Sequence, residues 1–472
     1  MSTHVEVRPG AYADSVTLLR VSRTVAGLDG VTAAQVAMAT PLNVDVLTGM
    51  GFEVPAGTGP NDLVVALRVT GDAELPAALA GVDTALAEAN RPAAGSGSGD
   101  GTGTAAPRTT GSALDRAAAP IALVSVPGPH AAVEAMDAIE AGCDVLIFSD
   151  NVPVEQEIAL KRAAVERSVL VMGPDCGTAV VHGLGLGFAN TVPPGPVGIV
   201  AASGTGCQQL LALLDHAGVG VTSALGVGGR DLSAEVRGLA TREALRRLDA
   251  DPAVELIVLV SKPPADDVAD EIRALAAGLA TPVEFALLGP GRPDLTAAAG
   301  SVLARLGRPV PDWPVHGSAR PAAGGRYLRG LFAGGTLATE AATVAAAAGA
   351  GAGAGHTFLD LGDDAYTAGR AHPMIDPTLR LEHLRAALAD PDTAVVLLDV
   401  VLGHGAEPDP AAALVPVLSG ARPPVVVTVV GTAADPQDLH RQVGALVAAG
   451  AEVHLSQAGA TRRAVELLGT AQ

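Results

Sequence analysis

The chain has 472 residues, 49% of them hydrophobic but only 2% aromatic, so large cores can be built mainly from alanine, glycine and valine. Its 50 acidic and 30 basic residues give a formal charge of −20, which disfavours binding to nucleic acid or anionic membranes. No apolar run is long enough for a membrane span, the N-terminus lacks signal-peptide features, and the dispersed Cys143, Cys176 and Cys207 suit a reducing compartment, so a cytoplasmic protein is expected.

The first 90 residues predict a small α/β domain. Apolar runs with alternating character mark strands, and amphipathic stretches mark the helices between them. A Gly/Ser-rich stretch follows and buries no apolar surface, so residues 91–117 are predicted to be a flexible linker. The predicted strands are Val5–Val7, Val31–Met38 and Leu63–Val69, and the predicted helices are Asp14–Ala26 and Asp72–Glu88.

From Ile121 onward, continuous apolar strands alternate with helices, a pattern typical of parallel sheets covered on both faces. The predicted fold class is therefore α/β, with several Rossmann-like or flavodoxin-like parallel-sheet domains at 118–195, 196–310 and 322–472. The predicted strands are Ile121–Val126, Val145–Phe148, Leu170–Met172, Val197–Val200, Thr222–Leu225, Leu256–Val260, His356–Leu361, Ala394–Val401, Val425–Val430 and Val453–Leu455. The predicted helices include Ala131–Ala141, Glu155–Glu166, Cys207–His216 and Ala234–Arg247.

The stretch Val197–Leu211 is the most informative one in the chain. A β-branched strand stops at Ser203-Gly204-Thr205-Gly206, and a helical pattern begins immediately. Glycines allow close backbone approach, and the free N–H groups and positive dipole end of a helix N-terminus suit a phosphate or carboxylate. An α/β turn that binds nothing is the alternative. Gly334-Gly335-Thr336 also precedes a helix and is compatible with either an anion site or a plain turn.

Several other side chains are compatible with chemistry, each with a structural alternative. Arg230, in G-V-G-G-R-D, suits bidentate carboxylate recognition, or a structural ion pair with its neighbouring aspartate. Cys176 is a nucleophile only if its pKa is lowered, and a small buried hydrophobe otherwise. Asp360, Asp363 and Asp364 are compatible with magnesium but are more typical of helix capping, so no metal site is assigned. His372 and His404 are either proton carriers or loop histidines.

The motifs of residues 118–300 resemble the α subunit of succinyl-CoA synthetase: I-A-L-V-S-V-P-G-P-H (121–130), M-G-P-D-C-G-T (172–178), V-G-I-V-A-A-S-G-T-G (197–206) and G-V-G-G-R-D (226–231). Residues 325–468 resemble the carboxyl-terminal domain of its β subunit, through F-L-D-L-G-D-D (358–364) and V-V-L-L-D-V-V-L-G-H-G (395–405). Their fusion behind a small N-terminal unit resembles the FdrA family, as do F-S-D-N-V (148–152), V-S-K-P-P-A (260–265) and H-P-M-I-D-P-T-L-R (372–380). The resemblance implies a CoA-binding-like domain followed by two ligase-like domains.

Two departures from the synthetase pattern change what the resemblance implies. The loop that carries the phosphorylated histidine in the synthetase reads L-L-G-P-G-R-P-D-L (287–295) here, and Lys262 stands where a glutamate assists that histidine. The ATP-grasp half of the β subunit has no counterpart in the sequence.

The resemblance implies a phosphate site formed by two facing helix N-termini, one at Ser203–Gly206 and one in the turn of Leu402, Gly403, His404 and Gly405. Lys262, Arg230 and His404 are the expected catalytic residues. The expected phosphate-binding residues are Ser203, Gly204, Thr205, Gly206, Gly334, Gly335, Thr336, Gly403 and Gly405, and the expected substrate-binding residues are Asp175, Cys176, Gly228 and Gly229.

The FdrA resemblance implies carbamoyl transfer between phosphate and oxamate, that is, oxalurate phosphorolysis in allantoin breakdown, with carbamoyl phosphate as a substrate and with partner subunits. One alternative is an acyl-CoA ligase that binds CoA, and another is a non-catalytic scaffold that binds a small anion. No cofactor is assigned, a homo-oligomer is left open, and the N-terminal domain carries no assigned chemistry beyond the signatures D-S-V-T-L-L and A-T-P-L-N-V-D-V-L.

Overall fold

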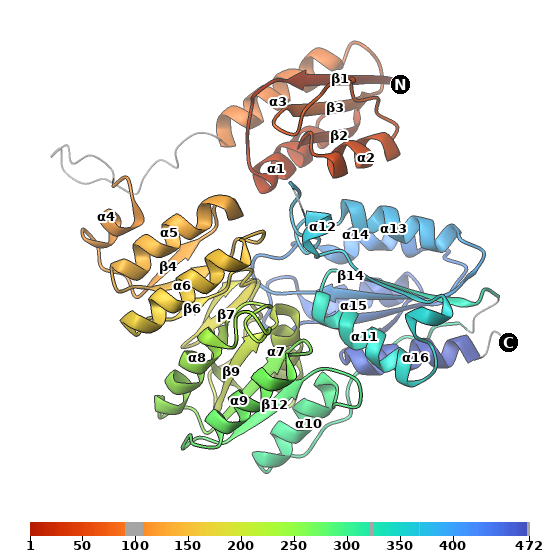
Figure 1. Ribbon diagram of the computed structural model, residues 1–472. Helices are drawn as coiled ribbons and strands as arrows, with labels where there is room; N and C mark the ends of the chain where they lie inside the picture. Colours follow the sequence, from red (N-terminus) through yellow and green to blue (C-terminus); the bar gives the residue numbers. More distant parts are fainter. Residues whose placement is uncertain (90–106, 321–323, 368, 470–472) are drawn as a thin grey trace. The chain divides into compact units, whose positions relative to one another are not determined.

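The computed structural model describes residues 1–89, 107–320, 324–367 and 369–469 (Figure 1). The chain forms two compact units, one comprising Met1–Ala106 and Asp363–Leu379, the other Pro107–Gly362 and Arg380–Gln472. The polypeptide therefore passes from one unit to the other after residues 106, 362 and 379. No helix within the described ranges combines the length and hydropathy needed to cross a membrane.

The small unit is built on an antiparallel sheet with strand order β1-β3-β2. Alternate residues of the central strand face opposite sides, as the two-residue period of a strand requires. Val65 and Leu67 pack under one cluster of side chains from α1 and α3, while Val64 and Ala66 contact Leu47 and neighbouring residues on the other face. The elements are β1 (Ser2–Arg8), α1 (Ser15–Ala26), β2 (Val31–Met38), α2 (Pro41–Gly49), β3 (Leu63–Val69), α3 (Leu75–Ala89) and, in the inserted segment, α12 (Asp364–Thr367).

The large unit begins with a three-stranded parallel sheet, β4-β5-β6, that carries α5 and α6. The short helix α4 (Thr110–Leu114) precedes it, inside the range predicted to be linker; residues 91–106 of that range lie outside the described residues. The elements of this sheet are β4 (Ile121–Val124), α5 (Gly128–Glu140), β5 (Asp144–Ile147), α6 (Val154–Arg167) and β6 (Val171–Met172).

A six-stranded sheet follows, in the order β12-β11-β9-β10-β7-β8. Strands β9 to β12 are parallel, whereas β7 and β8 form an antiparallel hairpin at one edge. The elements are β7 (Thr178–Val181), β8 (Leu184–Gly187), β9 (Val197–Ala202), α7 (Gly204–His216), β10 (Val221–Gly226), α8 (Leu239–Ala250), β11 (Leu256–Ser261), α9 (Asp266–Ala276), β12 (Val283–Leu287) and α10 (Leu295–Arg305).

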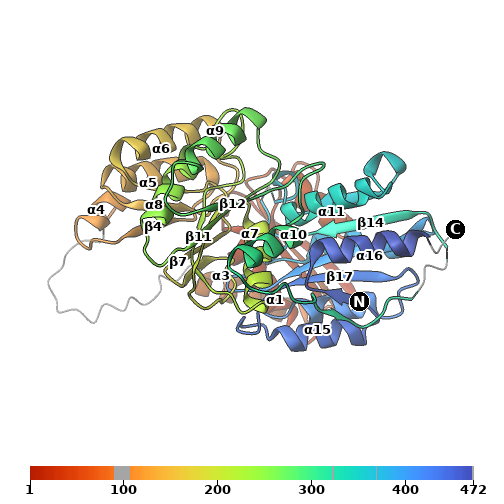
Figure 2. The same ribbon diagram turned by 90° about the horizontal axis from the view of Figure 1, so that it is seen from below.

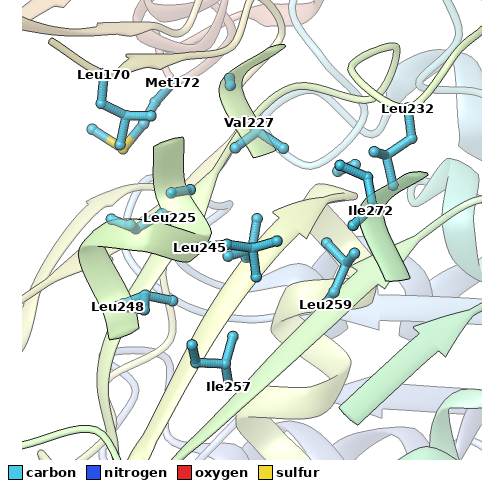
Figure 3. Close-up of a cluster of buried hydrophobic side chains, with 14 of the residues drawn as sticks. Leu170, Met172, Leu225, Val227, Leu232, Leu245, Leu248, Ile257, Leu259 and Ile272 are labelled. Carbon is cyan, nitrogen blue, oxygen red and sulfur yellow. The ribbon is translucent and has the colours of Figure 1, made fainter. Parts of the chain in front are cut away.

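A buried cluster of aliphatic side chains joins these two sheets (Figure 3). Leu170 and Met172 at β6 belong to the same cluster as Leu225 on β10 and Leu245 on α8. Burying a leucine contributes about 1.5–3 kcal/mol, so this cluster helps to hold the first two parallel-sheet domains together.

The last domain is a second six-stranded sheet, in the order β13-β18-β17-β16-β14-β15, parallel except at β13. Helices α11 and α16 pack side by side against it, and they also contact α7 and α10 of the preceding domain (Figure 2). The elements are β13 (Val315–His316), β14 (Tyr327–Phe332), α11 (Gly335–Ala347), a 3-10 turn at Ala352–Ala354, β15 (Thr357–Asp360), α13 (Thr378–Ala389), β16 (Thr393–Val401), α14 (Pro410–Leu418), β17 (Val425–Val430), α15 (Leu439–Ala448), β18 (Glu452–His454) and α16 (Gln457–Gly469).

The predicted α/β class with parallel-sheet domains is confirmed, and several elements differ in detail. The strands β12 and β14, the helix α2 and the β7–β8 hairpin were not among the predicted elements. The helix predicted from Ala234 begins at Leu239, because Arg237 and Gly238 adopt positive φ and interrupt it. Such residues stop a helical run regardless of the hydrophobic periodicity around them.

Candidate functional site

Four strands of the large unit end at residues that converge. β9 ends before Ser203, β11 before Lys262, β14 shortly before Gly334, and β15 at Asp360. Ligands of parallel α/β sheets bind beyond the carboxyl ends of the strands, where helix N-termini also gather. In this chain two such edges, one from each six-stranded sheet, meet.

The N-termini of α7 and α11 are in direct contact. Ser203, the N-cap of α7, accepts the Gly206 amide at 3.0 Å, and its Oγ also shares a 2.7 Å hydrogen bond with Thr336 Oγ1 in the first turn of α11. Both hydroxyls are buried. Two positive dipole ends and their first-turn N–H groups thus lie together, an arrangement that favours a bound anion.

Glycines permit this close approach. A Cβ on Gly334 would lie 2.7 Å from Thr205 Oγ1, and a Cβ on Gly206 would lie 2.2 Å from Ser203 Oγ. Neither glycine has a positive φ, so glycine is required at these positions because a side chain would not fit, and not because of the backbone conformation. We conclude that the motifs G-T-G (204–206) and G-G-T (334–336) form the two sides of one contact between α7 and α11.

Lys262 and Asp360 lie at the rim of this contact. Lys262 Nζ is 4.0 Å from Asp360 Oδ2, and its side chain is 43% exposed. A Cβ on Gly335 would come within 2.8 Å of Lys262 Nζ and 2.1 Å of Asp360 Oδ2, so both side chains border the first residue of α11. The site therefore contains one cation accessible to an incoming anion and one carboxylate that interacts with it.

A buried ion pair that sequence reasoning missed fixes the start of α11. Asp399, fully buried on β16, accepts the amides of Ala333 and Gly334 at 2.9 Å each. Arg380 pairs with the same carboxylate at 2.8 Å and also donates to the Leu331 and Asp399 carbonyls. Burial raises the pKa of Asp399, and Arg380 and the two amides oppose that rise. An aspartate inside the apolar run V-V-L-L-D-V-V was the available signal, since a buried carboxylate requires partners.

The turn of residues 402–406 does not form the second half of the site. The Gly403 amide donates to Gln437 Oε1 at 3.1 Å, and the His404 amide donates to the Ala189 carbonyl at 2.8 Å. A Cβ on Gly405 would lie 3.0 Å from the Gly187 carbonyl. The expected pairing of α7 with this turn is therefore corrected: the Gly403 amide bonds Gln437, the His404 amide bonds Ala189, and the first turn of α11 bonds Ser203 at the start of α7. His404 is exposed, with Nε2 3.2 Å from Thr191 Oγ1.

Arg230 is bound within a structural network. Its Nε donates to Glu157 at 3.0 Å and one terminal nitrogen donates to the Val152 carbonyl at 2.7 Å. Glu157 and the neighbouring Asp231 each pair with the buried Lys161 at 2.7 Å. The ion pair therefore differs from the expected alternative: Arg230 pairs with Glu157, and its neighbour Asp231 pairs with Lys161 instead.

The expected substrate-binding residues lie on two adjoining turns. A Cβ on Gly228 would lie 2.6 Å from the Pro174 carbonyl, whereas Gly229 has open space around it. Asp175 is exposed with a φ of 55°. Burial raises the pKa of the Cys176 thiol to about 12, so this cysteine is not a thiolate nucleophile at neutral pH.

Two further candidates lie in the segment after β15. Asp363 accepts the Ala365 amide at 3.0 Å, which is a capping role. Burial lowers the pKa of His372 to about 4.

Comparison with known proteins shows what parts of this chain are similar to. Residues 331–467 match the CoA-ligase family, and residues 1–102 match a family described as AllF, heavy metal-associated domain. The α-2 subunit of mitochondrial succinate–CoA ligase from Trichomonas vaginalis is 28% identical over 30% of this chain and 46% of its own length. The corresponding α 2 subunit from Archaeoglobus fulgidus is 30% identical over 32% of this chain and 52% of its own length. The chain thus spans about half of each ligase subunit.

The similarity to one relative covers almost the whole chain. The uncharacterized protein YahF of Escherichia coli K12 is 35% identical over 95% of both sequences, and this chain belongs to the YahF family. Among solved structures, the dinucleotide-forming acetyl-coenzyme A synthetase 1 of Ca. Korarchaeum cryptofilum, solved with phosphate and ADP, is 17% identical, with a TM-score of 0.29 over 74% of this chain and 82% of that chain.

The residues of the small unit do not fit the heavy metal that its family description implies. Heavy-metal ions favour thiolate ligands, but residues 1–102 contain no cysteine. The described residues also contain no group of three or more His, Cys, Asp or Glu side chains able to hold a metal ion. In the loop after β1, Asp14 caps α1 by accepting the Val16 and Thr17 amides. The small unit is therefore not suited to carry a soft metal.

Proposed function

We propose that this chain is a CoA-ligase-like subunit that transfers an acyl-type group to or from phosphate bound at the N-termini of α7 and α11. The observation that carries the proposal is the hydrogen-bonded meeting of these helix starts beside Lys262. Their dipoles and amides would bind phosphate, and Lys262 would neutralise one of its oxygens.

The reaction that suits such a site is displacement of phosphate from an acyl phosphate. A nucleophile attacks the carbonyl carbon, the bond from that carbon to the phosphate oxygen breaks, and its electron pair leaves with phosphate. The nucleophile's proton passes to water or to the phosphate. Donors aimed at the departing phosphate stabilise the charge that develops there, and they favour the reverse attack equally.

Acid–thiol ligation is the first candidate, with the CoA thiol as nucleophile. The match of residues 331–467 to the CoA-ligase family and the similarity to succinate–CoA ligase α subunits support it. Because the loop Gly289–Asp294 carries no histidine, acyl phosphate would have to reach this site without a phosphohistidine on that loop.

Carbamoyl transfer is the second candidate, following from the FdrA resemblance. Here the amide nitrogen of oxamate attacks carbamoyl phosphate to give oxalurate and phosphate, and the reverse is phosphorolysis. The same histidine-free loop favours it, since this exchange requires only free phosphate. Either reaction is proposed to require partner subunits, in a cytoplasmic enzyme.

The test begins with calorimetric titration of the full chain with inorganic phosphate. ³¹P NMR then follows phosphate release from succinyl phosphate with CoA and, separately, from carbamoyl phosphate with oxamate, each with and without copurifying partners. We expect phosphate binding and turnover in one arm, and the productive arm selects the nucleophile. No phosphate binding, and no turnover in either arm with partners present, would refute the proposal.

A further inference from the structure

One segment of the ligase-like part of the chain belongs structurally to the small unit. Residues Asp363–Leu379, between β15 and α13, cluster with residues 1–106 and not with the sheet from which they emerge. This segment contains most of the signature H-P-M-I-D-P-T-L-R, and the small unit contains the signature A-T-P-L-N-V-D-V-L. The proposed reaction uses neither signature.

The signature of the small unit binds the segment Asp363–Leu379 through buried polar groups. Asn43 Nδ2 donates to the Met38 carbonyl at 2.8 Å and to the Gly369 carbonyl at 3.1 Å, while Asn43 Oδ1 accepts Arg370 at 3.1 Å. Arg370 also pairs with Asp376 at 3.2 Å, and all three side chains are buried. Buried charges and amides require such partners, so release of the segment would expose or strand all of them.

The contact between the small unit and the segment also depends on close steric fit. Gly369 has a φ of 75°, and a Cβ there would lie 2.5 Å from Thr40 Cγ2. Asp376 caps the start of α13 by accepting the Thr378 amide at 3.0 Å. Arg23 on α1 donates to the Ile375 carbonyl at 3.0 Å. Residues 1–89 thus contact the segment at Gly369, Arg370 and Ile375.

Both ends of this segment lead directly to the candidate site. Asp360, whose Oδ1 accepts the Gly362 amide at 3.0 Å, precedes the segment and interacts with Lys262. Arg380 follows it immediately and pairs with Asp399, which holds the Ala333 and Gly334 amides. Restraining the segment therefore restrains, through the chain itself, a residue at the rim of the site and a residue that fixes α11.

We infer that residues 1–89 act as a docking module for the chain's own segment 363–379, and that Asn43, Arg370 and Asp376 are positioning residues for the phosphate site. This role replaces metal carriage, for which the small unit lacks ligands. Its consequence for phosphate rests on the proposed function, whereas the docking and the restraint of Asp360 and Arg380 do not.

Hydrogen–deuterium exchange of the full chain without phosphate tests the inference. The reporters are the amides of Ala333, Gly334 and Gly362, whose acceptors are Asp399 and Asp360. We expect Asn43→Ala and Arg370→Ala to accelerate exchange at these amides, as well as in 369–379, by about tenfold or more, as for loss of a buried hydrogen bond to a charged group. Arg370→Lys should accelerate exchange less than Arg370→Ala does, because lysine keeps a positive charge facing Asp376.

Thr48→Ala is the matched control, since Thr48 lies on α2 with Asn43 but its hydroxyl donates within that helix, to the Val44 carbonyl. Faster exchange in 369–379 with unchanged reporter amides would overturn the inference, as would unchanged exchange throughout. If the alanine variants do not fold, Arg370→Lys and Asp376→Asn are measured by the same reporters. Phosphate affinity of these variants is measured in a separate experiment. If the wild type binds no phosphate, the proposed function is refuted, but the docking inference is not.

Discussion

Lys262 and Asp360 set the local charge of the site. Removing the ammonium in Lys262→Met should weaken phosphate binding by about tenfold, because a charged hydrogen bond to a partly exposed group is worth about 1 kcal/mol or slightly more. Asp360→Asn should instead strengthen binding a few-fold, since the carboxylate 4.0 Å from Nζ repels the anion and competes for the cation. Calorimetry with phosphate measures both.

The control is Arg305→Met, which removes one positive charge from an exposed position on α10 where Arg305 pairs with Glu284. Its phosphate affinity should equal that of the wild type. Equal losses in Lys262→Met and Arg305→Met would mean that net charge, and not position, governs the affinity.

Glu340 makes stability depend on pH. Its side chain is buried on α11, one oxygen accepts the Leu295 amide at 2.6 Å, and burial raises its pKa to about 8 from an unperturbed 4.5. The folded state therefore keeps a proton that the unfolded state releases, so stability falls as pH rises from about 4.5 to about 8. Glu340→Gln keeps an oxygen that can accept the Leu295 amide but cannot ionise. At pH 9 the free energy of unfolding of this variant should therefore exceed that of the wild type by a few kcal/mol.

Urea unfolding at pH 5, 7 and 9 measures this difference. The exposed Glu235→Gln is the control for removing one carboxylate from the surface of the same unit. A difference between wild type and Glu340→Gln that does not grow with pH would contradict the raised pKa of Glu340.

At the scale of elements, the two glycines at the start of α11 have different neighbours: Gly334 borders α7, and Gly335 borders the side chains at the rim of the site. A Cβ at Gly334 meets the branched Thr205 side chain, which cannot yield without moving a helix, whereas a Cβ at Gly335 meets the movable ends of Asp360 and Lys262. We expect Gly334→Ala to lower stability by about 1–3 kcal/mol. Gly335→Ala should mainly weaken phosphate binding.

Thermal unfolding and phosphate titration separate these two outcomes. Gly444→Ala, on α15 with open space around its position, is the control and should stabilise the chain by up to about 1 kcal/mol. If Gly335→Ala loses stability as much as Gly334→Ala does, the side chains of Asp360 and Lys262 are more rigidly held than inferred.

At the scale of the whole molecule, the two units have separate cores and are expected to unfold in separate steps. Leu67→Ala opens the core of the small unit and Leu259→Ala that of the large unit, each at a cost of about 2–5 kcal/mol. In scanning calorimetry each variant should lower the temperature of one transition and leave the other nearly unchanged. A single transition that both variants shift equally would show one cooperative unit.

Much of the architecture could be predicted from the chain because its causes are local. The apolar run before Ser203, the glycines after it and the helical period that follows define β9, its turn and α7 without reference to any distant residue. The same local patterns gave the alternation typical of parallel sheets. Lys262 could be singled out because it follows a predicted strand, and Gly334–Thr336 because it precedes a helical pattern.

Only the tertiary structure decided which elements meet, because hydrogen-bond partners far apart in the chain leave no local pattern. Two glycine-rich turns, at 334–336 and at 403–405, were compatible with an anion site, and the second was the one expected to face α7. The second uses its amides for Gln437 and Ala189, so the first faces Ser203. Likewise, nothing near Asn43 or Arg370 in sequence indicates that they bind each other, because the two residues are 327 positions apart and are brought together only by folding.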